Sequence, residues 1–225
     1  MTRLGLTMAT DVGLRRQVNE DSAYLTPQVQ AIADGMGGHG HGDLASAIAI
    51  DVVREFSGTD LGFVVAEIAR RLDEQAPFGC GTTLTAMRWD ENRFQLGHIG
   101  DSRGYLLRSG ELRQLTRDHT MVQALVDEGR MSAEEAAEHP RRNMLMRALQ
   151  SGTEPHRPDL AWHDALPGDR YLLCSDGLTD YVEIEAIHNA LYSDRETAAA
   201  ELVALANGAG GFDNVTCLLI DVPCR

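Results

Sequence analysis

Short apolar runs rich in branched residues recur along the chain, and each is bounded by Gly, Asp or Asn. Runs of this kind are typical of β-strands. They predict strands at Leu4–Thr10, Val29–Ala33, Thr82–Trp89, Arg93–Ile99, Arg103–Arg108, Asp169–Cys174 and Val215–Asp221.

Other apolar residues recur at the spacing of a helix that buries one face. Two such stripes follow each other, formed by Leu44, Ile48, Val52, Val53 and Phe56 and then by Leu61, Val64, Val65, Ile68 and Leu72. Two further helices are predicted near Glu183–Leu191 and Arg195–Ala206. Because strands and helices come in blocks, the pattern favours a largely antiparallel α+β fold, such as a layered sandwich, over a doubly wound parallel sheet.

The segment from about Asp118 to Pro158 departs from this pattern. It is charged, rich in Ala and Arg, contains Pro140, Pro155 and Pro158, and has only weak periodicity. We expect short helices on an irregular insert. Since no repeat or linker divides the chain, we expect one domain over residues 1–225, which is long enough to bury a substantial core.

The charged residues of the chain exclude several classes of function. The chain has 34 acidic and 20 basic residues, a formal charge of −14, and every basic residue is an arginine. The absence of lysine excludes P-loop, protein-kinase and Schiff-base chemistry, each of which needs an ammonium group. The acidity argues against nucleic-acid binding, which requires a basic surface.

The expected location is the cytoplasm. The cysteines Cys80, Cys174, Cys217 and Cys224 lack C-x-x-C spacing, which favours a reducing compartment. No apolar stretch reaches the ~20 residues that span a bilayer, and the first residues lack a secretory apolar core. We therefore expect a monomer that makes no membrane contact through this chain.

Carboxylates recur where predicted strands end or in Gly-rich turns. They occur in Asn19-Glu20-Asp21, Asp34-Gly35, Asp101-Ser102, Asp176-Gly177 and Asp213-Asn214. One such residue is an ordinary turn former, but a group gathered at one sheet edge would repel unless a cation lay between them. Oxygen ligands select hard metals such as Mg²⁺ or Mn²⁺. Two such ions could share a water and clamp a phosphoryl group, which predicts phosphate-ester hydrolysis.

An arginine lies close to this acidic set in the sequence. Arg16 precedes Asn19 by three residues and Glu20 by four, so one turn brings its guanidinium beside the carboxylates. The planar guanidinium matches two phosphate oxygens. A surface arginine paired with Glu20 is the structural alternative.

Taken together, the motifs resemble those of the metal-dependent serine/threonine protein phosphatases of the 2C type, and the chain looks like a bacterial member. The resemblance covers about residues 10–220. It rests on Arg16-x-x-Asn19-Glu20-Asp21, Ala33-Asp34-Gly35-Met36-Gly37-Gly38-His39, Gly81-Thr82-Thr83, Gly100-Asp101-Ser102-Arg103, Leu115-Thr116-x-Asp118-His119-Thr120, Cys174-Ser175-Asp176-Gly177-Leu178 and Asp213-Asn214-Val215-Thr216. It implies a four-layer αββα sandwich of two antiparallel sheets flanked by helices.

The resemblance also implies site roles. Asp34 would bridge two Mn²⁺ or Mg²⁺ ions, the Gly35 carbonyl would add a ligand, and Asp176 and Asp213 would complete the set. Asp101 would hold a third, weaker ion with Asp176. Glu20 would act through metal-bound water, Asp21 would lie behind the ligands, and Arg16 would bind the substrate phosphate.

Two further features follow from the resemblance. The insert at about 118–158 would be the family's flap, in which Arg141 and Arg142 either contact a phosphopeptide or are solvated surface arginines. Met36 stands where some relatives have a proposed general-acid His, so His39 or water would protonate the leaving group. The expected partners are phosphorylated proteins and Ser/Thr kinases.

Three alternatives remain open. Gly35-x-Gly37-x-x-Gly40 satisfies the dinucleotide fingerprint, although Asp34 would place a negative charge at its start. His39-x-His41-x-Asp43 resembles the opening of the metallo-β-lactamase zinc signature, with Leu44 in place of the last His. The third alternative is an inactive phosphatase domain that binds phosphoproteins without cleaving them.

Overall fold

Two antiparallel sheets form the centre of the computed structural model, which describes residues 4–37 and 41–224. The first sheet has the strand order β1 (Gly5–Asp11), β12 (Val215–Asp221), β11 (Arg170–Cys174), β7 (Arg103–Arg108) and β8 (Glu111–Gln114). The second has the order β10 (Asp159–Asp164), β6 (Arg93–Ile99), β5 (Leu84–Asp90), β3 (Val29–Met36), β4 (Gly81–Thr82) and β9 (Leu149–Gln150), and β2 (Asp21–Leu25) pairs with β3.

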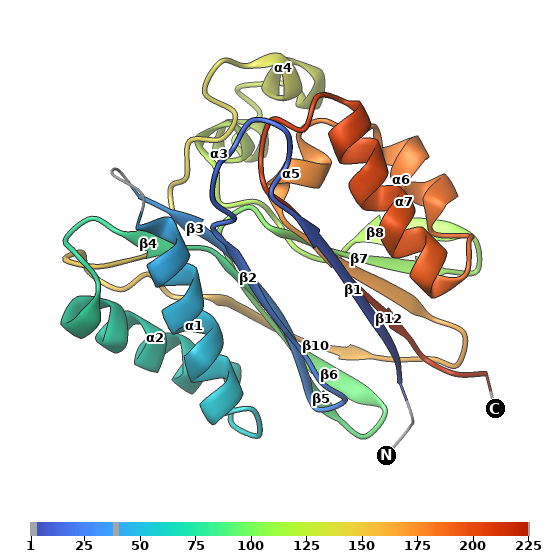
Figure 1. Cartoon of the computed structure of the whole chain (residues 1–225), viewed down its shortest axis with the longest axis horizontal. Helices are drawn as coiled ribbons and strands as arrows, with labels where there is room; N and C mark the ends of the chain where they lie inside the picture. The colour runs from blue at the N-terminus through green and yellow to red at the C-terminus, as the bar shows by residue number, and fades with distance from the viewer. Residues whose placement is uncertain (1–3, 38–40, 225) are drawn as a thin grey trace.

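Helices cover the outer face of each sheet (Figure 1). The helices α1 (Gly42–Glu55) and α2 (Leu61–Gln75) pack on the second sheet, and α6 (Ile184–Ala190) and α7 (Arg195–Gly208) lie on the side of the first. Separate hydrophobic cores fill the three interfaces between these layers. The predicted four-layer αββα sandwich is confirmed.

The helices bury most of the residues that the sequence pattern indicates. The predicted stripe of α1 is wrong at Leu44, which is 38% exposed, and Phe56 lies just beyond the end of that helix. Asp60 caps α2 by accepting a hydrogen bond of 2.9 Å from the Gly62 N–H, and Asp194 caps α7 through the Thr197 N–H. The predicted stripe of α2 is buried: Leu61, Val64, Val65, Ile68 and Leu72.

Most predicted strands are present, and β6, β7 and β12 match their predicted bounds. The predicted strand Thr82–Trp89 is divided into β4 and β5 at Thr83. Thr83 bonds Asp34 instead, because its backbone N–H donates to the Asp34 carbonyl and its hydroxyl oxygen accepts from the Asp34 N–H. Some elements were not predicted from the sequence, namely β2, β8, β9, β10 and the short helix α5 (Asp176–Thr179). Edge strand β10 is exposed along most of its length, so it lacks the alternation that identifies strands.

The insert at 118–158 contains the short helices α3 (Met121–Asp127) and α4 (Ala133–Glu138) and ends in β9 and a loop, as expected for an irregular segment. It lies over one end of the sandwich (Figure 1). All strand pairs that the structure describes are antiparallel, which contradicts the dinucleotide-binding alternative and its parallel sheet. Within residues 4–37 and 41–224, no helix is long and apolar enough to span a bilayer.

Candidate metal centre

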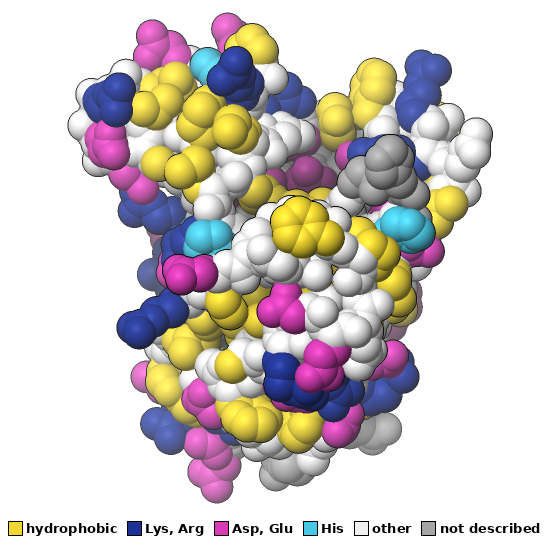
Figure 2. All heavy atoms as spheres, turned by 90° about the vertical axis from the view of Figure 1, so that its left-hand side faces the viewer, with side chains coloured by type: hydrophobic (Ala, Val, Ile, Leu, Met, Phe, Trp, Pro, Cys, Tyr) yellow, Lys and Arg dark blue, Asp and Glu magenta, His cyan; other side chains and the backbone are white. Residues whose placement is uncertain are grey.

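The predicted acidic residues meet at the end of the sandwich that the insert overhangs. Asp34 lies near the end of β3, Asp176 is the first residue of α5, and Asp213 precedes β12 by two residues. Asp101 follows β6 and is buried. Figure 2 shows acidic side chains at the base of a notch at this end of the molecule.

Asp21 and Asp34 form the first close pair of this group. They face each other directly in the β2–β3 ladder, so their side chains lie on the same face of the sheet. Ser175 Oγ donates a hydrogen bond of 2.8 Å to Asp21 Oδ2, whereas Asp21 Oδ1 is buried without a partner among the described residues. Burial raises the pKa of Asp21 to about 6. A buried oxygen of this kind calls for a water or a cation.

Neighbouring carboxylates repel one another strongly here. Burial, and then the charge of Asp21 and that of Asp176, raises the pKa of Asp34 well above its ordinary value. Burial and the charge of Asp101 do the same for the pKa of Asp176. Divalent cations would remove this repulsion, so the donor set fits the expected hard metal ions.

The site is open rather than a closed protein cage. Among residues 4–37 and 41–224, no three Asp, Glu, His or Cys side chains converge closely enough to enclose one ion by themselves. Mg²⁺ and ions like it usually keep several waters and take few protein ligands. The open arrangement therefore suits such ions and leaves room for a substrate oxygen.

Two glycines allow the backbone to pack tightly around the carboxylates. A Cβ on Gly35 would lie 2.0 Å from the Gly42 carbonyl oxygen at the start of α1, and a Cβ on Gly177 would lie 1.9 Å from that of Asn214. These close approaches explain why Gly follows both Asp34 and Asp176.

Arg16 lies at the edge of this cluster. Its Nη2 donates a hydrogen bond of 2.8 Å to Asp213 Oδ2, and its Nη1 lies 3.8 Å from Glu20 Oε2. The side chain is 47% exposed, so the guanidinium remains accessible to an incoming anion. The structure thus brings Arg16 to the carboxylates, and its pairing with Glu20 is weaker than its pairing with Asp213.

A loop carries both Arg16 and Glu20, and Asn214 holds it in place. Asn214 Nδ2 donates to the carbonyls of Val12 and Val18, and Asn214 Oδ1 accepts a hydrogen bond of 2.8 Å from the Glu20 N–H. Glu20 Oε1 accepts a bond of 3.1 Å from the N–H of Gly42. Asn214 belongs to the predicted Asp213-Asn214 motif, but no role was predicted for it.

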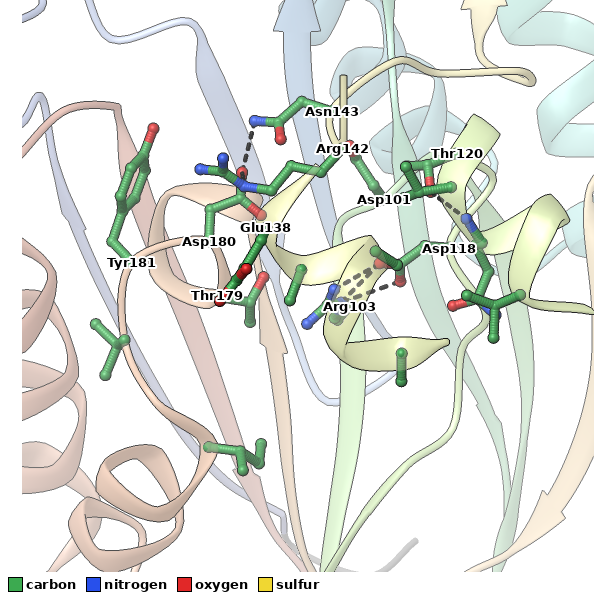
Figure 3. Close-up of a pocket in the computed structure, with 18 of the residues that line it drawn as sticks. Asp101, Arg103, Asp118, Thr120, Glu138, Arg142, Asn143, Thr179, Asp180 and Tyr181 are labelled. Carbon is green, nitrogen blue, oxygen red and sulfur yellow. Dashed lines mark hydrogen bonds and ion pairs between the residues drawn. The ribbon is translucent and has the colours of Figure 1, made fainter. Parts of the chain in front are cut away.

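Asp101 opens onto a cleft of about 610 Å³ under the insert (Figure 3). Burial, followed by the charges of Asp118 and Asp180, raises the pKa of Asp101 to about 7. Asp118 is paired with Arg103, whose Nη2 lies 2.6 Å from Asp118 Oδ2. The charge of Asp101 in turn contributes to the raised pKa of Asp176, and the third metal site that these two residues would share stays a prediction.

Asp180, which the sequence motifs did not identify, connects the insert to the acidic cluster. Asp180 Oδ2 accepts a hydrogen bond of 2.5 Å from Asn143 Nδ2 and lies 3.8 Å from Arg142 Nε (Figure 3). Its position four residues after Asp176, one helical turn along α5, was the available signal. Arg142 lines the cleft, whereas Arg141 is exposed and is not among the residues that line it.

Two histidines that the zinc-hydrolase alternative could use are engaged in other contacts, and His41 of its motif is exposed just before α1. His39, the predicted proton donor, lies outside the described residues. His98 and His119 are buried in other contacts, with His98 Nε2 bonded to the Arg117 carbonyl and His119 Nε2 to Asp159. Neither has a ring nitrogen left to bind zinc at the acidic cluster.

Sequence comparison identifies relatives of this chain. The family model described as "Protein phosphatase 2C" matches residues 5–125. The serine/threonine protein phosphatase PstP of Mycobacterium tuberculosis is 46% identical over 95% of this chain, which spans 44% of the length of that protein. The serine/threonine phosphatase stp of Listeria welshimeri is 36% identical, with 94% of this chain and 93% of that protein covered.

Structural comparison agrees. A crystal structure of the catalytic domain of the serine/threonine phosphatase PstP in complex with two manganese ions has a TM-score of 0.88 and 44% identity, and the match covers 98% of each chain. The predicted family and fold are confirmed by both comparisons. The chain belongs to the protein phosphatase 2C family.

Proposed function

We propose that this chain is a metal-dependent phosphatase that hydrolyses phosphoserine and phosphothreonine in proteins. The observation that carries the proposal is the gathering of Asp34, Asp176 and Asp213 around one open site with Arg16 at its edge. The names of the relatives support it, as do the two manganese ions of the PstP structure.

Each residue has a distinct proposed role at the metals. Asp34, the Gly35 carbonyl, Asp176 and Asp213 would hold two Mn²⁺ or Mg²⁺ ions, and Asp101 would hold a third, weaker ion with Asp176. When bound, divalent ions supply an activated water and neutralise charge on the phosphoryl group. Asp21, which is hydrogen-bonded to Ser175 and lies opposite Asp34 in the β2–β3 ladder, would not bind the metals directly but would add its negative charge beside Asp34.

The remaining residues would place the substrate. Arg16 would turn from Asp213 toward the phosphate and bind two of its oxygens, because a guanidinium offers several N–H donors in one plane. Glu20, which lies 3.8 Å from Arg16 and is fixed by the Gly42 N–H, would orient water at the metals. Asn214 holds the loop that carries Arg16 and Glu20 next to Asp213, because it bonds the Glu20 N–H and the Val18 carbonyl.

The substrates would be proteins phosphorylated by Ser/Thr kinases. The enzyme would act in the cytoplasm as a monomer, and residues 1–225 would form one catalytic domain. The net charge of −14 supports the expectation that nucleic acid is not a partner. The cleft beneath the insert at 118–158 gives this segment, the proposed flap, access to a peptide that enters the site.

The test is hydrolysis of a phosphothreonine peptide and of p-nitrophenyl phosphate, with Mn²⁺ and after chelation. We expect turnover only with Mn²⁺ or Mg²⁺, and its loss in the Asp213→Asn variant. Full activity after exhaustive chelation would exclude the proposed chemistry. Mn²⁺ binding without turnover of either substrate would instead favour the inactive, phosphoprotein-binding alternative.

A further inference from the structure

An exposed group of large side chains borders the candidate metal centre. Leu14 is 67% exposed and Phe212 47% exposed, and Tyr181 and Arg15 lie beside them. We call these four residues the rim platform. They come from the β1–β2 loop, the loop after α5 and the loop before β12, so the fold brings together three distant parts of the chain.

The rim platform is built by specific contacts. The backbone N–H groups of Leu14 and Arg15 donate hydrogen bonds of 2.7 and 3.1 Å to the Gly211 carbonyl, which fixes one loop against the other. The ring centroids of Tyr181 and Phe212 are 5.2 Å apart, and the Arg15 guanidinium carbon lies 5.7 Å from the Phe212 centroid. The side chains of the rim platform are therefore already ordered, so they would lose little conformational entropy when a ligand binds.

The rim platform is next to the residues that would bind the phosphate. Arg15 directly precedes Arg16, and Phe212 directly precedes Asp213. Consecutive Cα atoms of the protein are about 3.8 Å apart, and an extended peptide advances by about the same distance per residue. A substrate residue close to the phosphorylated one could therefore reach Arg15 or Phe212. Tyr181 also lines the cleft that contains Asp101 and lies at one end of it, beyond Asp180 (Figure 3).

We propose that the rim platform binds an apolar side chain within two residues of the phosphorylated residue of a substrate. The inference rests on the proposed function and adds to it a sequence preference. Contact with the phosphate alone would recognise any phosphopeptide. Covering Leu14 and the ring of Phe212 with an apolar group is favourable, whereas covering them with a polar group leaves that group without hydrogen bonds, so an apolar residue in the substrate is favoured.

The shape and chemistry of the surface favour a peptide side chain as the occupant. Stable protein–protein interfaces use about 20–30 residues on each side, far more than these four. The Arg15 guanidinium lies over the Phe212 ring, so its charge is partly engaged by that ring. Because Arg15 and Phe212 adjoin Arg16 and Asp213 in the chain, and Tyr181 lines the cleft with Asp101, the rim platform is within reach of residues that flank a phosphate held at Arg16.

A peptide series tests the preference in the unmodified protein. Phosphothreonine peptides would carry Leu or Ser at each of the two positions before and after the phosphorylated residue, and kcat/KM would be measured with Mn²⁺. We expect Leu to exceed Ser by about tenfold at one position at least, as one partly buried apolar side chain provides. Equal kcat/KM values for all the peptides would overturn the inference.

The variant Leu14→Ser then locates the preference. We expect it to reduce the advantage of Leu over Ser to less than about threefold. Leu160→Ser is the matched control, because Leu160 is also exposed, at 45%, but lies on the edge strand β10, and it should keep the full advantage. A Leu14→Ser variant that retains the full preference would overturn the inference.

Hydrolysis of p-nitrophenyl phosphate separates the inference from the proposed function. This substrate has no neighbouring residue, so it reports the metal centre alone. If the unmodified protein hydrolyses it while showing no preference among the peptides, the inference fails and the proposed function stands. If the protein hydrolyses neither substrate with Mn²⁺, the proposed function fails.

Discussion

His119 Nδ1 accepts a hydrogen bond of 3.1 Å from the backbone N–H of Gly100, and the Gly100 carbonyl accepts one of 2.8 Å from the backbone N–H of His119. Gly100 directly precedes Asp101, and His119 stands at the start of the insert. The insert is thus attached by its first residues to the loop that carries one of the candidate metal ligands. The sequence motif Asp118-His119 predicts an anchor for the insert, and this contact agrees with that prediction.

Replacing His119 should destabilise the protein. In His119→Ala the buried Gly100 N–H loses its acceptor, and an unpaired buried donor costs about 1–3 kcal/mol. Urea denaturation of the metal-free protein would measure this loss. His156→Ala is the control, because His156 is exposed, and it should leave the midpoint unchanged. An unchanged midpoint in His119→Ala would show that the contact contributes nothing to stability.

His98 should make stability depend on pH. Burial, and then the charge of His119, lowers the pKa of His98 to about 4. The unfolded chain takes up this proton near pH 6.5, so the free energy of unfolding falls as the pH drops from about 6.5 to about 4. The loss is on the order of 3 kcal/mol, from 2.5 pKa units at about 1.4 kcal/mol each.

The measurement is urea denaturation of the wild-type protein and His98→Gln between pH 4 and pH 7.5. Other groups titrate in the same range, so the informative quantity is the difference between the two proteins. We expect this difference to shrink steadily below pH 6.5. A difference that stays constant with pH would exclude His98 as the source.

The sequence predicted the parts of the fold in which burial has a simple period. The strands β6, β7 and β12 and the helices α1 and α2 each bury a continuous run or one face. The missed β10 is an exposed edge strand, and β2 has every residue half-buried, so neither has a pattern to detect. The break between β4 and β5 depends on Thr83 bonding Asp34, which is a tertiary contact.

The candidate site was predicted as a set of residues, and its geometry was not. The motifs located Asp34, Asp176 and Asp213, because a carboxylate before a tight turn leaves a local sequence signal. The β2–β3 register that places Asp21 opposite Asp34 could not be read from the sequence. The spacing of Asp180 from Asp176 was visible in the sequence, but its hydrogen bond with Asn143, 37 residues away, was not.

Arg16→Ala should weaken phosphate binding. A charge-assisted hydrogen bond contributes about 1.5–3 kcal/mol, which corresponds to a loss of roughly 10- to 100-fold in kcat/KM. Much of the loss should appear in KM if the arginine contacts the phosphate in both the ground state and the transition state. Steady-state kinetics with p-nitrophenyl phosphate would measure it, with Arg113→Ala on β8 as the control. An unchanged kcat/KM would leave Arg16 as a surface partner of Asp213.

Asp34→Asn should abolish activity and leave the fold intact. The substitution removes a candidate bridging ligand, so we expect kcat to fall by at least about 100-fold and the affinity for Mn²⁺ to fall with it. It also removes a carboxylate that Asp21 and Asp176 repel, so the metal-free variant should unfold at a higher temperature than the wild type. Calorimetry of metal binding and thermal denaturation would report the two effects separately. Loss of the circular-dichroism signal would indicate a structural role instead.

Asp101→Asn should separate the third metal from the other two. Asp101 reaches the centre from the β6–β7 loop and not from β3, so the two tight ions should still bind in a calorimetric titration. A weaker third event should disappear, because an ion with few protein ligands and many waters depends strongly on each of them. We expect kcat to fall more than KM rises, which would mean that the third ion assists the chemical step. Loss of the tight sites, or unchanged stoichiometry and kcat, would remove Asp101 from the site.

The same variant gives a second readout without metal. Burial and the charges of Asp118 and Asp180 raise the pKa of Asp101 to about 7, whereas the unfolded chain ionises this group near pH 3.9. The folded state therefore holds more protons between these values, and the contribution of Asp101 to stability is lost as the pH rises from about 4 to about 7. At pH 7.5 metal-free Asp101→Asn should unfold at a higher temperature than the wild type, and at pH 4 the two should be nearly equal. Because Mn²⁺ favours the ionised carboxylate, saturating Mn²⁺ should reverse the order at pH 7.5. A variant that is less stable than the wild type at pH 7.5 without metal would show that Asp101 is not strained by its acidic neighbours.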